Sequence, residues 1–179
     1  YKLLNLKPDI VVYGKSIGNG YAISAIVGKK KYMKFANKTF LSSVSWTERV
    51  GFAAGISVID FFTKKKVAKH LIKMGKVIKK GWLQSAKKNK ILIEIGEMKA
   101  IPTFRFKYGN YNEKLYTIFT NLMLQEKYLA TNAIYLSNKH NLNYIKKYLI
   151  FFDKVFKKIE NIIKNKKNLN KIKKRKYNY

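Results

Sequence analysis

A single lysine between an apolar run and a glycine-containing turn is the feature that most constrains this chain. Residues 10–12 (Ile-Val-Val) are continuously apolar, which is typical of a strand covered on both faces in an α/β sheet. Lys15 follows this run, and a Gly-Asn-Gly turn occupies residues 18–20. The amine of Lys15 is therefore expected where a buried strand meets a tight turn, unlike the many other lysines.

Strands and helices are expected to alternate along the rest of the chain. A capping box is predicted where Ser45 is followed three residues later by Glu48. Apolar residues at spacings of three and four predict the later helices, and alternation predicts the strands. The predicted strands are residues 22–28, 91–96, 103–108 and 133–136, and the predicted helices are residues 46–62, 65–86, 112–127 and 142–163. Residues 29–37 are predicted as a short helix or loop.

The net charge of +30 suggests a polyanion partner, but only three of the 39 basic residues are arginine. Arginine is the usual residue for bidentate recognition of phosphates and bases. The lysines are also spread along the chain among many Asn, Ile and Tyr residues. This mixture favours a genome-wide bias toward A and T codons over nucleic-acid binding.

The sequence gives no support for a metal site, a membrane span or a signal peptide. There is no cysteine, and His70 and His140 are far apart without a ligand at metal spacing, so we expect surface roles for both and no metal. No apolar run reaches the roughly 18 residues that span a bilayer, so we expect no membrane partner. The polar start is no signal peptide, which favours the cytoplasm. Because the chain begins without Met, we expect a piece of a longer protein or a processed product.

Lys15 and a downstream hydroxyl cluster suit two needs of a pyridoxal-phosphate enzyme. Such an enzyme needs a lysine amine that reacts with the cofactor aldehyde, and hydroxyl or N–H groups that hold its phosphate. Thr39, Ser42 and Ser43 precede a predicted helix and suit the second need. It also needs a carboxylate for the pyridine nitrogen, and none of the aspartates has an obvious route to the ring. The three aspartates are Asp9, Asp60 and Asp153.

The same residues resemble a known family. Pro-Asp-Ile-Val-Val-Tyr-Gly-Lys-Ser-Ile-Gly-Asn-Gly-Tyr-Ala-Ile-Ser-Ala-Ile-Val-Gly, residues 8–28, resembles the lysine segment of class III pyridoxal-phosphate aminotransferases, closest to the glutamate-1-semialdehyde aminomutase-like branch. Thr-Phe-Leu-Ser-Ser at residues 39–43 and Trp-Thr-Glu-Arg-Val-Gly at residues 46–51 resemble its next segment. Lys-Tyr-Leu-Ala at residues 127–130, Ile-Tyr-Leu-Ser at residues 134–137 and His140 resemble its C-terminal domain.

The resemblance implies a fold and an organisation. The fold would be α/β, the fold-type I of pyridoxal-phosphate-dependent transferases. Residues 1–63 would be the end of the large α/β domain and residues 64–165 the small C-terminal α+β domain, with a basic, disordered tail at 166–179. The family's pyridine-binding aspartate, ring-stacking aromatic residue and phosphate loop lie upstream of the first residue here. The chain alone is therefore expected to be inactive.

The resemblance also implies roles for individual residues. Lys15 would form the internal aldimine with pyridoxal 5'-phosphate and then shuttle protons. Thr39 would contact the cofactor phosphate across a homodimer interface with shared active sites, and Ser42 and Ser43 are alternative phosphate or substrate contacts. The substrates would be small amino donors and acceptors. Family glycines are replaced at some positions, including the one before Tyr-Leu-Ala, where Lys127 stands.

Blander interpretations stay open. Lys15 can be a solvated lysine at a strand end, since lysine is mostly exposed. Thr39, Ser42 and Ser43 can be ordinary loop and capping residues. Arg105 can meet a substrate carboxylate, although its alternating strand favours exposure. The alternative function is a non-catalytic, lysine-rich protein that binds nucleic acid or anionic surfaces.

Overall fold

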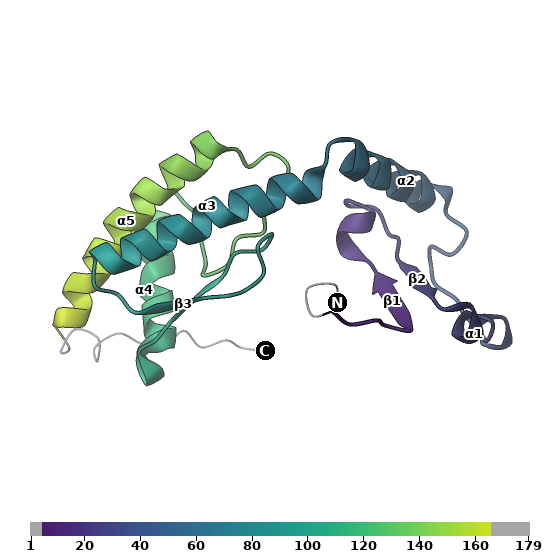
Figure 1. Ribbon diagram of the computed structural model, residues 1–179, viewed down its shortest axis with the longest axis horizontal. Coiled ribbons are helices and arrows are strands. Elements are labelled where there is room, and N and C mark those ends of the chain that lie inside the picture. The colour runs from purple at the N-terminus through teal and green to yellow at the C-terminus, as the bar shows by residue number, and fades with distance from the viewer. Residues whose placement is uncertain (1–4, 166–179) are drawn as a thin grey trace. The chain divides into compact units, whose positions relative to one another are not determined.

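The computed structural model describes residues 5–165, and the chain divides into two compact units (Figure 1). Unit 1 is Tyr1–Lys66 and unit 2 is Val67–Tyr179. This division lies close to the predicted boundary after residue 63. The assignment of the units to a large and a small domain stays a prediction. The predicted disordered tail lies outside the described residues.

Unit 1 is a two-stranded ribbon, short helical turns and one longer helix. β1 (Ile10–Tyr13) pairs antiparallel with β2 (Ala25–Gly28), so Ile10 lies opposite Gly28. The remaining elements are the 3₁₀ helices η2 (Lys15–Ile17) and η3 (Ala36–Lys38) and the α-helices α1 (Lys30–Met33) and α2 (Arg49–Lys64). The residues between η3 and α2 are irregular, as their hydroxyl-rich sequence predicts.

The strand at β1 is confirmed, but the prediction that both its faces are covered is wrong for the described part of the chain. Val12 is 66% exposed and Ile10 is 49% exposed. Among residues 5–165, β1 pairs with β2 and with no other strand. The apolar sequence indicated burial, and the elements described here do not provide it.

The predicted capping box at the start of α2 is also wrong. The helix begins at Arg49, and Glu48 is its N-cap, with extended backbone at φ −70° and ψ 122° and no capping hydrogen bond from a side chain. The N–H of Glu48 instead donates to the carbonyl of Ser45 in a turn. This turn occupies the residues that the capping motif assigned to the helix.

Glycines let α2 pack against the chain that follows η2. A Cβ atom added at Gly51 would lie 2.7 Å from the carbonyl oxygen of Ala22. One added at Gly55 would lie 3.4 Å from Cδ1 of Ile23. The contact at Gly51 leaves no room for a side chain, so it requires glycine.

Unit 2 packs three helices around a small antiparallel ribbon. Its long helices α3 (Val67–Lys88) and α5 (Leu142–Lys164) contact each other, and α4 (Asn112–Gln125) contacts α5. β3 (Ile93–Ile95) pairs with β4 (Phe104–Phe106), and η4 (Gly109–Tyr111) precedes α4. The predictions of these helices and of this strand pair are confirmed. The predicted strand at 133–136 is wrong, because this segment makes only an isolated bridge between Ala133 and Thr103.

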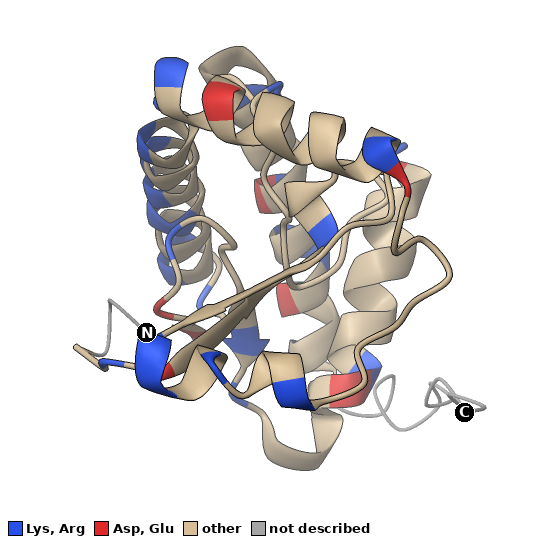
Figure 2. Cartoon of the chain, turned by 90° about the vertical axis from the view of Figure 1, so that its right-hand side faces the viewer, with Lys and Arg blue, Asp and Glu red and all other residues tan. Residues whose placement is uncertain are grey.

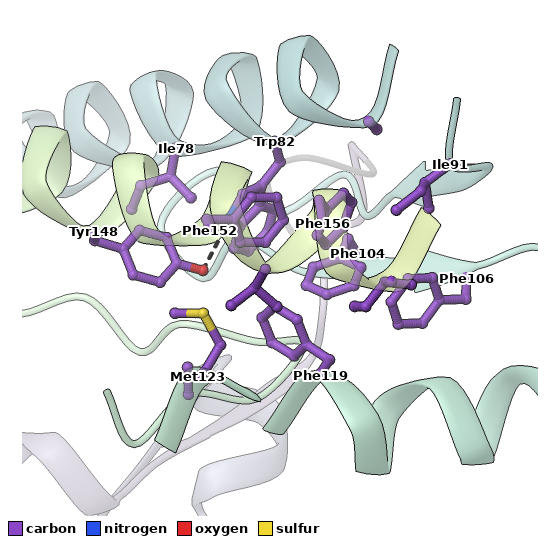
Figure 3. Packing of buried hydrophobic residues seen from close by; sticks show 14 of the residues in the cluster. Ile78, Trp82, Ile91, Phe104, Phe106, Phe119, Met123, Tyr148, Phe152 and Phe156 are labelled. Atoms are coloured by element: carbon purple, nitrogen blue, oxygen red, sulfur yellow. Dashed lines mark hydrogen bonds between the residues drawn. The ribbon is translucent and has the colours of Figure 1, made fainter. Parts of the chain in front are cut away.

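Aromatic side chains of α3, β4, α4 and α5 meet in one core (Figure 3). The Phe104 ring of β4 lies edge-on to Trp82 of α3, with 5.1 Å between ring centroids. The ring centroids of Phe152 and Phe156 of α5 lie 4.1 Å apart. Trp82 Nε1 donates a hydrogen bond of 3.1 Å to the hydroxyl of Tyr148, so this buried polar pair is satisfied. Unit 2 therefore has a closed core of its own.

Candidate functional site

Lys15 lies in the turn that follows β1, with its side chain exposed. Its backbone φ is +53°, a left-handed conformation that is uncommon outside glycine and asparagine. The turn is closed by the N–H of Ile17 donating to the carbonyl of Gly14, at 3.3 Å, and by the N–H of Gly18 donating to the carbonyl of Lys15, at 3.3 Å. Within residues 5–165 the Lys15 ammonium makes no ion pair or side-chain hydrogen bond. The Lys15 amine therefore has no bonding partner within this part of the chain and is available to a ligand.

The three hydroxyl residues singled out in the sequence come together on a cavity of about 980 Å³ in unit 1. Thr39, Ser42 and Ser43 all line it. The hydroxyl of Thr39 donates to the carbonyl of Ala36 at 3.0 Å, whereas those of Ser42 and Ser43 have no hydrogen-bond partner within residues 5–165. The last two are free to donate to a ligand.

The rest of the cavity wall is mostly apolar. It is built by residues of β1, β2, α1, α2 and the loops between them, with Ile23, Phe35, Trp46 and Phe52 as the large apolar members. Lys15 does not line this cavity. The structure therefore brings Thr39, Ser42 and Ser43 together, and Lys15 lies apart from them in the same chain.

Glu48 is a cavity residue that the sequence did not single out for function. Glu48 lines the cavity, and its carboxylate has no ion-pair partner within residues 5–165. The sequence motif assigned it to helix capping, and only the extended backbone before α2 reveals a different position. Glu48 could have been identified as a cavity residue only if the first residue of α2 had been predicted correctly.

The three aspartates are all engaged elsewhere. Asp9 pairs with Lys29 at 2.7 Å, and this hydrogen bond raises the pKa of Lys29 above its ordinary value. Asp60 pairs with Lys64 at 3.3 Å on the exposed face of α2. Asp153 lies in unit 2 and accepts hydrogen bonds from α3. None of the three lines the cavity in unit 1.

A second cavity, of about 770 Å³, lies in unit 2 and was not predicted. Tyr128, Tyr135, Tyr144 and Tyr148 line it, together with His140. Tyr128 and Tyr135 lie in the connection between α4 and α5, and Tyr144 and Tyr148 lie on α5, so their sequence positions carry no shared pattern.

The histidines are part of the structure of unit 2 and not plain surface residues, which corrects the prediction for both. Each is half-buried. Nε2 of His70 lies 2.7 Å from the carbonyl oxygen of His140, and Nδ1 of His140 accepts from the N–H of Ser137 at 3.0 Å. These bonds connect α3 to the loop before α5. Arg105 has its side chain exposed on β4, as the alternation predicts.

Positive charge dominates the surface of the described chain (Figure 2). Most acidic side chains are used in ion pairs, such as Lys107 with Glu94 at 3.1 Å and Lys154 with Glu126 at 2.8 Å. None of the helices within residues 5–165 is long and apolar enough to span a bilayer.

The architecture matches that of solved transaminases. The internal aldimine form of FumI from Sphingopyxis sp. MTA144 superposes with a TM-score of 0.84 at 19% identity, covering 97% of this chain and 41% of that one. An omega-transaminase from Sphaerobacter thermophilus gives a TM-score of 0.78 at 13% identity, covering 87% of this chain and 40% of that one. The chain therefore corresponds to part of the α/β fold of these fold-type I pyridoxal-phosphate-dependent transferases, as predicted.

Curated relatives by sequence are aminotransferases. A 3-aminobutyryl-CoA aminotransferase of Cloacimonas acidaminovorans is 40% identical over 67 residues, which are 37% of this chain and 16% of the relative. A 2'-deamino-2'-hydroxyneamine transaminase of Streptomyces kanamyceticus is 33% identical over 82 residues, which are 46% of this chain and 21% of the relative. The chain thus matches only a minor part of the length of either. No protein-family model matches the chain.

Proposed function

We propose that this chain is part of a class III pyridoxal-phosphate aminotransferase in which Lys15 binds the cofactor. The observation behind the proposal is the uncommitted amine at the turn after β1, in a chain whose fold is that of transaminases. The aminotransferase names of the sequence relatives give further support. Neither name is that of an aminomutase, so the aminomutase-like branch stays a prediction.

The residues present fit two of the cofactor's needs. Pyridoxal phosphate, when bound, supplies an aldehyde for an amine and an electron-withdrawing ring for amino-group transfer. Lys15 offers an exposed amine, which can bind covalently and then accept or donate a proton. The free hydroxyls of Ser42 and Ser43 are suitable donors for a phosphate, and Thr39 can join them by exchanging its bond to Ala36. None of the three aspartates lines the cavity, so the residues described here place no aspartate near a ring nitrogen, and Glu48 is the one acidic residue of that cavity wall.

The separation of Lys15 from the hydroxyl cavity supports a site shared between two copies of the chain. In that arrangement the hydroxyls around Thr39 in one copy serve the Lys15 of the other, as in the homodimer that the resemblance implies. The substrates would be small molecules that donate or accept an amino group. A non-catalytic lysine-rich binder is not needed to explain a transaminase fold, and we do not favour it.

Replacement of Lys15 tests the proposed attachment. We expect protein from the native source to show a visible absorbance band from bound pyridoxal phosphate, and Lys15→Ala to lose that band because no other amine occupies the turn after β1. Lys7→Ala is the matched control, since Lys7 is also exposed and lies just before β1. A band of unchanged intensity in Lys15→Ala would refute the assignment.

Mixed dimers test the shared site. A Lys15→Ala copy and a copy with Thr39→Val, Ser42→Ala and Ser43→Ala each lack a different half of the proposed site. We expect both homodimers to be impaired and the mixed preparation to regain amino-transfer activity, because one of its two sites has all its groups. If mixing restores nothing, the site is not shared in this way.

A further inference from the structure

Burial is distributed unevenly between the two units. Every buried apolar side chain among the described residues lies in unit 2, from Val67 to Ile159. In the described part of unit 1 the only buried residues are Gly18, Gly51 and Gly55. Unit 2 therefore closes a core, and unit 1 on its own does not.

The helix α2 exposes apolar side chains around most of its circumference. Phe52 is 59% exposed, Ile56 64% and Ile59 55%, and only the glycine face is covered. Val50, Phe61 and Phe62 are also at least 42% exposed. A helix that is apolar on nearly all sides is normally buried in a larger core. The outer face of α2 therefore needs a covering partner.

The β1–β2 ribbon shows the same property. Ile10 and Val12 are exposed on β1, and Ile26 and Val27, which point to opposite faces of β2, are 51% and 47% exposed. Each strand also has one edge without a strand partner among residues 5–165 (Figure 1). A two-stranded ribbon of this kind is marginal alone, and its free edges are templates for further strands.

We infer that the outer face of α2 and the β1–β2 ribbon together dock a polypeptide segment that carries the part of the transaminase fold this chain does not span. The inference goes beyond the proposed function, because it rests on fold and burial and not on the chemistry of Lys15. The occupant adds strands to the ribbon and apolar side chains to α2.

The share of the transaminase fold that this chain spans indicates which segment docks on α2 and the ribbon. The FumI structure covers 97% of this chain, whereas this chain covers only 41% of FumI. The remaining part of such a fold has to pack somewhere, and unit 1 is the unit whose apolar side chains are uncovered. A second copy is a poorer occupant, because a two-fold interface covers one patch, whereas apolar side chains here face outward from α2 and from both faces of the ribbon.

Site-specific crosslinking in the native source tests the inference. A benzophenone amino acid is placed at Ile56 on α2, and the matched control is placed at Leu83 on α3, which is also exposed, at 49%. We expect the probe at position 56 to crosslink to a peptide outside this sequence that resembles the part of transaminases not spanned here. The probe at position 83 should give no such peptide. Crosslinks from position 56 only to residues 5–165 of a second copy, or none at all, would overturn the inference.

A charge placed on the same face provides an independent test. We expect Ile56→Glu to weaken association with the crosslinked segment by about tenfold or more, because an unpaired carboxylate is costly to bury. Leu83→Glu should leave association unchanged, and fluorescence of Trp82 reports whether unit 2 stays folded. Equal association of the two variants would contradict the docking surface. Lys15→Ala should also leave association unchanged, so failure of this inference can be told apart from failure of the proposed function.

Discussion

Lys127 stands at a helix end where the backbone conformation favours glycine. It follows the C-cap of α4 and has φ +64°. The N–H of Tyr128 donates to Met123 and that of Lys127 to Leu124, both at 2.9 Å, which is the Schellman pattern that ends many helices. A glycine at this position, which the resemblance leads one to expect, would therefore have a conformational reason, because the position requires a left-handed backbone.

We expect Lys127→Gly to stabilise unit 2 by roughly 0.5–1 kcal/mol, because glycine removes the strain of a left-handed lysine but adds entropy to the unfolded chain. Urea unfolding followed by fluorescence of the buried Trp82 measures the change. Lys87→Gly, inside the last turn of α3, is the control and should destabilise by about 1 kcal/mol. Equal effects of the two glycines would show that the backbone at Lys127 is not strained.

At the scale of elements, a polar cluster joins α3 to α5. Asp153 of α5 accepts hydrogen bonds from Ser85 at 2.9 Å, Asn89 at 3.0 Å and Lys88 at 2.6 Å. Burial raises the pKa of Asp153, but these three donors outweigh it and hold the pKa below its ordinary value. Ser85 and Asn89 are themselves buried, and the carboxylate accepts from the Ser85 hydroxyl and from the Asn89 amide, which also donates to the carbonyl of Ser85 at 2.9 Å.

Removing the carboxylate should therefore be costly. We expect Asp153→Ala to lower the free energy of unfolding by about 1–3 kcal/mol, since the buried Ser85 hydroxyl loses its acceptor and the buried Asn89 amide loses one of its acceptors. Asp60→Ala is the control, because its pair with Lys64 is exposed and should contribute well under about 1 kcal/mol. Urea denaturation compares the two. A loss no larger for Asp153 than for Asp60 would mean that the cluster does not hold the helices together.

The elements also show what the sequence can and cannot predict. The stripes of α3 and α5 were predictable because one apolar face repeats over many residues, and the core confirms it. The start of α2 was not, because the Ser45–Glu48 motif spans only four residues and a turn satisfies it equally well. The sequence pattern and the resemblance identified four candidate site residues, Lys15, Thr39, Ser42 and Ser43. The position of Glu48 on the cavity depends on tertiary packing that no local pattern records.

At the scale of the whole molecule, lysine is in such excess that ion pairs with lysine strongly affect the pKa of the few acidic groups. Hydrogen bonds from Lys157 and Lys164 lower the pKa of Glu160 from about 4.5 to about 2. A carboxyl whose pKa is lower in the folded than in the unfolded chain stabilises the fold above its unfolded pKa. This contribution is present above about pH 4.5 and is lost as the pH falls toward 2.

We therefore expect Glu160→Gln to lower stability at about pH 7 and to flatten the decline on acidification, because the variant has no carboxyl to protonate there. Urea midpoints at about pH 7 and about pH 3 measure both effects. Glu94→Gln is the control, since Glu94 pairs with Lys107 on an exposed surface. If Glu160→Gln and the unchanged protein decline in parallel, Glu160 does not contribute to the acid sensitivity.

We propose that one lysine among the many, Lys15, binds the cofactor. Borohydride reduction of the protein from its native source fixes pyridoxal phosphate to the lysine that holds it, and peptide mass mapping then locates the label. We predict a phosphopyridoxyl label on Lys15 and its disappearance in Lys15→Ala. A label confined to another lysine, or spread over the exposed lysines with Lys15 unmarked, would contradict the account.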